Sequence, residues 1–73
     1  MNKTKIIKTL NFMKENHIQR VKFTSGFLLS YDFEREEYSI WEGCMLRKTI
    51  VHRDLDTFVL KASEWVAEKE IAL

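Results

Sequence analysis

The chain has 73 residues, of which 45% are hydrophobic and 12% aromatic, a composition typical of a folded chain and not of a disordered one. This length allows a single domain that spans residues 1–73. Twelve Lys and Arg residues against eleven Asp and Glu residues leave a formal net charge of +1. The chain therefore lacks the strong basic excess that non-specific nucleic-acid binding requires.

Several features indicate a cytoplasmic protein. No apolar run approaches the roughly 18 residues that span a bilayer, and the segment after the basic N-terminus is too interrupted for a signal peptide. Cys44 is the only cysteine, so no disulfide forms within the chain, and a lone thiol is typical of a reducing compartment. The Lys-, Glu- and Ile-rich, proline-free composition is typical of an AT-rich bacterial or phage genome. Because so small a domain is only marginally stable, we expect a homodimer or a partner to support it.

Residues 4–16 are expected to form the first helix, because apolar side chains recur there at the helical spacing of three or four. Asn2 or Thr4 is suited to cap its start, and Asn16 is suited to the left-handed conformation that ends a helix. The side chains predicted to share its apolar face are Ile6, Ile7, Leu10, Met13 and His17.

Residues 18–51 are expected to form strands, because apolar and polar side chains alternate with a period of two. A tight turn at residues 25–26 separates the first two strands, and the charged segment 34–37 connects the second to the third. The stretch 45–51 is expected to form a fourth strand, although its alternation is less regular.

Residues 54–70 are expected to form the second helix, capped by Asp54 or Asp56, whose negative charges favour the positive end of the helix dipole. Trp65 falls on its wide apolar face, and for a buried Trp the change to Ala costs about 3 to 5 kcal/mol. The other members of that face are Leu55, Phe58, Val59, Ala62, Val66 and Leu73.

The predicted fold class is therefore α+β. An antiparallel meander of three or four strands carries an amphipathic helix at each end, and both helices cover one face of the sheet. This element order resembles that of double-stranded-RNA-binding domains and of small bacterial toxins built on that fold. Such domains carry a lysine cluster at the start of the last helix, where this chain has Asp54, Asp56 and Thr57. The chain is therefore assigned to no family.

Cys44, His52 and Asp54 have the chemistry of a nucleophile, a base and an orienting group. Cys44 and His52, however, lie at opposite ends of one predicted strand, a span on the order of 25 Å, which is far beyond hydrogen-bond reach. His52, Asp54 and Asp56 alternate like metal ligands in a loop, but acidic residues before a helix are ordinary caps. We therefore predict no enzyme activity, metal, cofactor or small-molecule substrate.

The face of the sheet away from the helices is the first candidate binding surface. Trp41 is expected to point outward there, surrounded by Arg20, Lys22 and Arg47. Aromatic side chains among basic ones can stack bases while the charges follow phosphates. Trp and Arg are equally enriched at the centres of protein interfaces. The balanced net charge favours a protein partner over a polyanion.

Two further candidate surfaces lie on the helices. Phe12 falls among Lys5 and Lys8 on the polar side of the first helix, where it could contact an acidic partner or a nucleic acid. A stripe that includes Leu60 and Ile71 on the second helix suits a dimer contact or docking in a groove. The sequence thus favours a small protein-interaction module, encoded by a phage or mobile element, that binds another protein or itself. A nucleic-acid-binding protein that uses the basic and aromatic sheet face is the alternative, and no membrane partner is expected.

Overall fold

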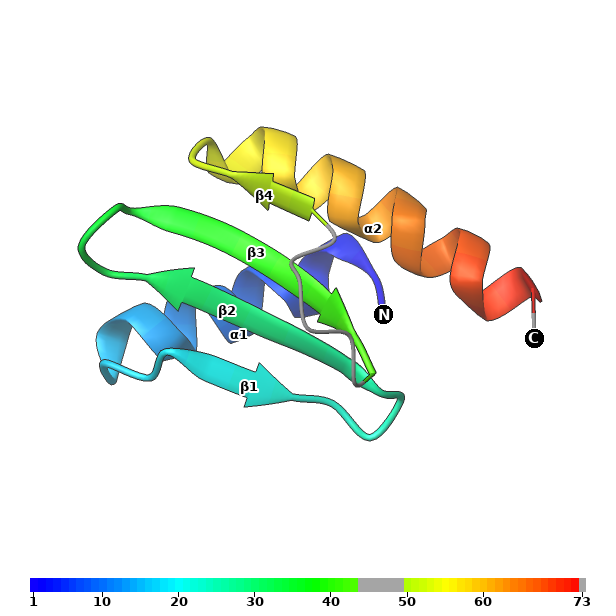
Figure 1. Ribbon diagram of the computed structural model, residues 1–73, viewed down its shortest axis with the longest axis horizontal. Coiled ribbons are helices and arrows are strands. Elements are labelled where there is room, and N and C mark those ends of the chain that lie inside the picture. The colour runs from blue at the N-terminus through cyan, green and yellow to red at the C-terminus, as the bar shows by residue number, and fades with distance from the viewer. Residues whose placement is uncertain (44–49, 73) are drawn as a thin grey trace.

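The computed structural model describes the backbone of residues 1–43 and 50–72 and the side chains of residues 1–43 and 50–70. The described elements are α1 (Lys3–Glu15), β1 (Arg20–Lys22), β2 (Phe27–Asp32), β3 (Glu37–Glu42), β4 (Ile50–His52) and α2 (Leu55–Ala72). The strands form one antiparallel sheet in the order β1-β2-β3-β4, and both helices pack against the same face of it (Figure 1). The predicted α+β meander with a helix at each end is confirmed.

The start of α1 is capped as expected. The Asn2 side-chain oxygen accepts a hydrogen bond of 2.9 Å from the backbone N–H of Lys5, which satisfies one of the free donors of the first turn. The side chains of α1 that are fully buried against the sheet are Ile6, Leu10 and Met13. Ile7, which was predicted to share that face, is partly exposed.

The end of α1 differs from the prediction, and the assignment of Asn16 to the left-handed conformation is wrong. His17 adopts that conformation, with φ 55°, and is exposed beyond the helix instead of on its apolar face. Asn16 is the C-cap, and both its backbone N–H and its side-chain amide donate to the carbonyl of Phe12. The chain therefore reverses one residue later, where the N–H of Ile18 donates to the carbonyl of Met13 over 2.8 Å and closes the helix.

The turn between β1 and β2 depends on Gly26. Its N–H donates to the carbonyl of Phe23 over 3.0 Å, and the N–H of Phe23 donates to the carbonyl of Phe27 over 2.8 Å. Gly26 has φ 98°, in a region that side chains disfavour, so glycine suits this three-residue hairpin loop. The predicted tight turn is confirmed.

The turn between β2 and β3 is held by the side chain of Asp32. One of its carboxylate oxygens accepts the N–H groups of Glu34 and Arg35, over 3.0 and 3.1 Å. Asp side chains commonly stabilise turns in this way. Glu36 then reverses the chain with φ 53°, an unusual value for a residue other than glycine.

Strand β4 and helix α2 follow the predicted order. Residues 50–51 lie in β4, which extends to His52, while positions 45–49 of the predicted strand lie outside the described residues. Asp54 caps α2 by accepting both the N–H and the hydroxyl of Thr57, over 2.9 and 2.7 Å. Asp56 lies in the first turn of the helix, where its charge favours the helix dipole. No helix in the described part of the chain is long and apolar enough to cross a membrane.

One hydrophobic core joins the sheet to both helices. It is formed by Ile6, Leu10, Met13, Phe27, Leu29, Tyr31, Tyr38, Ile40, Phe58, Val59, Ala62 and Val66. Trp65 packs against this core with its ring edge-on to that of Phe27, at a centroid distance of 5.3 Å. Its side chain is partly exposed, and the cost of its truncation stays a prediction.

Candidate functional site

The open face of the sheet brings together most of the side chains that the sequence singled out. Lys22 of β1 is paired with Leu28 of β2, which is paired with Trp41 of β3. Arg20 is paired with Ser30 in the next row toward the hairpin between β2 and β3. Paired residues point to the same side of a sheet, so these five side chains share one face.

This shared face is the one that the helices leave uncovered. The alternate residues of β2, Phe27, Leu29 and Tyr31, are buried in the core on the helix side. Their neighbours along the strand must then point away from the helices. The fourth predicted residue of this surface, Arg47, lies outside the described residues.

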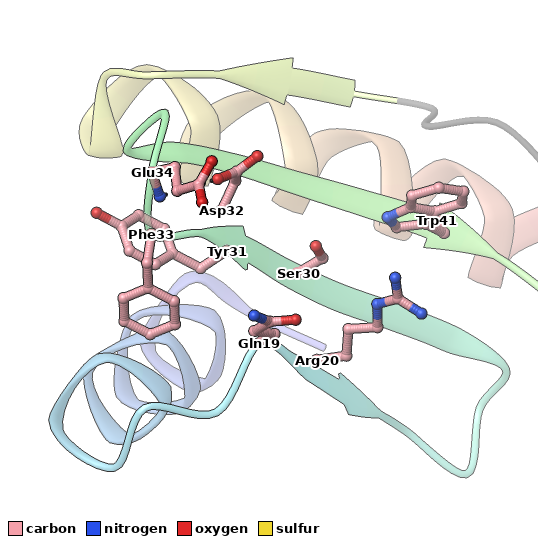
Figure 2. A pocket seen from close by; sticks show the side chains of 8 residues that line it. All are labelled: Gln19, Arg20, Ser30, Tyr31, Asp32, Phe33, Glu34 and Trp41. Atoms are coloured by element: carbon pink, nitrogen blue, oxygen red, sulfur yellow. Dashed lines mark hydrogen bonds between the residues drawn. The ribbon is translucent and has the colours of Figure 1, made fainter.

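A depression of about 440 Å³ lies along this face. Figure 2 shows the residues that line it, which are Gln19, Arg20, Ser30, Tyr31, Asp32, Phe33, Glu34 and Trp41. The nitrogen-bearing edge of the Trp41 indole faces the other side chains of the depression (Figure 2). That nitrogen, Nε1, is buried and has no hydrogen-bond partner among the described residues. A buried donor without a partner is unfavourable, so this indole nitrogen is a local weakness of the fold.

The charges along the depression are of both signs. Arg20 lies at one side, and the carboxylates of Asp32 and Glu34 lie toward the hairpin. A backbone of phosphates would meet these carboxylates as well as the arginine, which weakens the attraction that nucleic-acid binding needs. Mixed charges around an aromatic side chain are typical of the rim and centre of a protein interface.

The two helical surfaces do not join this face. Phe12 is 54% exposed on α1 and Leu60 is 44% exposed on α2, and both helices lie on the opposite side of the sheet (Figure 1). The Nζ atom of Lys5, expected beside Phe12, lies instead over the ring of Phe23, 5.3 Å from its centroid. Ile71 belongs to α2, but its side chain lies outside the described residues. Exposed apolar side chains such as those of Phe12 and Leu60 are common on protein surfaces.

A second hollow of about 370 Å³, which was not predicted from the sequence, lies at one end of the molecule (Figure 1). It is lined by Lys14, Tyr31, Arg35, Glu36, Tyr38 and Arg53. The Lys14 ammonium donates a hydrogen bond of 2.7 Å to the hydroxyl of Tyr38, and this bond raises the pKa of Lys14 above its ordinary value of 10.5. Burial raises the pKa of Tyr31 above 10.0.

The sequence carried one signal of this hollow. In an antiparallel meander, the β2–β3 connection and the segment after β4 come to the same end of the sheet. Arg35 and Arg53 stand in these two segments. The addition of Lys14 depends on where α1 ends over the sheet, which only the packed structure determines.

The residues considered for catalysis and metal binding have other surroundings. Cys44 lies outside the described residues. Asp54 is occupied as a helix cap: its hydrogen bonds from Thr57 lower the pKa of its carboxyl below the ordinary value of 3.8, and the charge of His52 adds to this shift. Within residues 1–43 and 50–70, no three His, Cys, Asp or Glu side chains gather closely enough to hold a metal ion.

Comparisons with protein-family models, with curated proteins and with solved structures found no match to this chain. The two hollows differ in chemistry: the one beside Trp41 combines an aromatic side chain with both charges, and the one beside Lys14 has an excess of cations.

Proposed function

We propose that the chain is a non-enzymatic protein-interaction module whose docking surface is the open face of the sheet around Trp41. The observation that carries this proposal is the half-buried Trp41 at the edge of a depression on the sheet face that no helix covers. Large aromatic side chains with a polar edge contribute strongly to protein contacts, because they bury much area and lose little conformational freedom.

The charges indicate what kind of partner fits. Arg20 and Lys22 would face a carboxylate of the partner, and the carboxylates of Asp32 and Glu34 would face a basic side chain. The partner is thus a protein segment with an apolar centre and charges of both signs.

Peptide selection tests this surface directly. Peptides selected from a displayed library for binding to the wild-type chain are measured against Trp41→Ala, whose fold is checked by circular dichroism. We expect Trp41→Ala to weaken binding at least about ten-fold, the loss of an aromatic contact worth about 1.4 kcal/mol or more. Phe12→Ala is the matched control, because it removes an exposed aromatic ring from the opposite side of the sheet and should leave binding unchanged.

Two outcomes would overturn the proposal. Peptides that bind Trp41→Ala as tightly as the wild type would place the contact elsewhere, and loss of the fold in Trp41→Ala would make this side chain part of the core. The alternative function, nucleic-acid binding by Arg20, Lys22 and Trp41, is tested by titrating DNA and RNA while following tryptophan fluorescence. Saturable quenching that fades steeply with salt would favour that alternative, because phosphate contacts release counterions.

A further inference from the structure

The hollow beside Lys14 is built from three segments that meet at one end of the molecule. Lys14 stands in the last turn of α1, Arg35 in the β2–β3 hairpin, and Arg53 between β4 and α2 (Figure 1). Glu36 is the only carboxylate among the side chains that line the hollow. The chain as a whole is nearly neutral, so this gathering of three cations is a local excess.

The tyrosines hold the lysine in place. The Lys14 ammonium lies 5.2 Å from the ring centroid of Tyr31 and 5.1 Å from that of Tyr38, and it donates to the Tyr38 hydroxyl. An ammonium has three N–H donors, so two remain for a ligand. The Tyr38 hydroxyl accepts from Lys14, and its own hydrogen remains available as a donor. Both tyrosines are buried, which fixes these donors before any ligand arrives.

The arginines supply the remaining donors. Neither Arg35 nor Arg53 forms an ion pair within the described part of the chain, and both are exposed. A guanidinium offers parallel N–H groups that match the oxygens of a phosphate. We propose that this hollow binds the phosphate group of a small phosphate ester. A volume of about 370 Å³ is near the lower end of the range for small-ligand sites, about 300 to 1,000 Å³.

The negative charge of Glu36 should weaken phosphate binding. A variant that removes this charge should therefore bind phosphate more tightly, whereas variants that remove an arginine should bind it less tightly. Besides the hydrogen bond to Tyr38, the charge of Glu36 contributes to the raised pKa of Lys14, so the two groups attract each other. A phosphate must compete with this carboxylate for the lysine. Glu36→Gln keeps the length of the side chain and its backbone conformation but removes the charge, and it should tighten phosphate binding several-fold.

The experiment is a titration of the ¹⁵N-labelled chain with inorganic phosphate and with phenyl phosphate, followed by NMR against sodium chloride of equal ionic strength. We expect saturable shifts confined to the amides around Lys14, Arg35 and Arg53. Arg35→Ala and Arg53→Ala should each weaken both ligands about ten-fold, because a hydrogen bond to a charged group is lost. Lys61→Ala is the matched control: it removes an exposed cation from α2 outside the hollow and should change nothing.

Each contrary result identifies a different error. Shifts spread over all basic residues, or arginine variants that bind as well as the wild type, would overturn the site. If inorganic phosphate binds and phenyl phosphate does not, the proposal that the ligand is a phosphate ester is wrong. If a short RNA or DNA duplex shifts these amides while both small ligands fail, the hollow belongs to a nucleic-acid surface. None of these titrations depends on the face around Trp41. The phosphate site and the proposed function are therefore tested separately.

Discussion

Among the residues that the structure describes, His17 and Glu36 are the two other than glycine that adopt the left-handed backbone conformation. The His17 ring stacks on that of Phe33 at a centroid distance of 4.6 Å. The Glu36 carboxylate attracts Lys14. Such a backbone conformation costs roughly 1–2 kcal/mol for a residue with a Cβ atom.

Glu36→Gly should raise the free energy of unfolding. Glycine removes the left-handed penalty, and after its greater freedom in the unfolded chain is subtracted, a gain of about 0.5 to 1 kcal/mol remains. Urea unfolding measures this gain as a higher midpoint. Glu36→Ala serves as the control, since it removes the carboxylate and keeps the Cβ atom. An equal midpoint for the glycine and alanine variants would show that backbone strain at this turn is negligible.

At the scale of elements, both helices begin at a capping side chain, Asn2 for α1 and Asp54 for α2. Of these two capping side chains, only that of Asp54 titrates. Its carboxylate accepts two hydrogen bonds from Thr57, one from the backbone N–H and one from the hydroxyl. Its lowered carboxyl pKa means that the folded chain favours the charged form. The contribution of this cap is therefore present above the unfolded pKa, about 3.8, and is lost as the pH falls through the folded value.

Asp54→Ala should lower the thermal midpoint at neutral pH, and the difference from the wild type should shrink as the pH falls below about 3.8. Asp54→Asn separates the two effects, because an amide oxygen also caps a helix but does not titrate. Thermal unfolding followed by circular dichroism at a series of pH values measures both. A difference between wild type and Asp54→Ala that is constant with pH would contradict the role of the charged cap.

At the scale of the whole molecule, stability depends on the contact between α2 and the sheet. Phe58 is fully buried and stacks on the ring of Tyr38 at a centroid distance of 5.6 Å, while Trp65 is only half-buried. Phe58→Ala should lower the free energy of unfolding by about 3 to 5 kcal/mol, enough to unfold much of so small a domain. Trp65→Ala should cost less, because its side chain is partly exposed in the folded chain whereas that of Phe58 is fully buried.

Urea unfolding of the two variants, followed by circular dichroism, compares these costs. Leu60→Ala on the exposed side of α2 is the reference, and it should change stability by no more than about 0.5 kcal/mol. If Trp65→Ala lowers the free energy of unfolding more than Phe58→Ala does, the prediction that Phe58 contributes more to stability is wrong.

The elements and their order follow from the sequence, because periodicity and turn chemistry act over a few residues. The alternation along Phe27, Leu29 and Tyr31 predicts which side of β2 is buried, and the open face of Trp41, Arg20 and Lys22 follows from that pattern. The end of α1 could not be assigned to the residue, because Asn16 and His17 both fit a helix end and the hydrogen bonds to Phe12 and Met13 decide between them.

The sequence by itself thus determined the α+β class, the turns and the sidedness of the sheet, and it narrowed the start of each helix to two capping candidates. All of these features depend on near neighbours in the chain. Only the tertiary structure decided that Trp41 is half-buried beside a depression with its indole nitrogen unpaired, and that Lys14, Arg35 and Arg53 line one hollow. Lys14 is more than twenty residues away in the sequence from Tyr38, its hydrogen-bond partner. Local sequence patterns cannot predict a contact over such a separation. The burial of Trp41 and the clustering of these cations depend on the packing of the helices and strands, because packing brings segments that are distant in the sequence into contact.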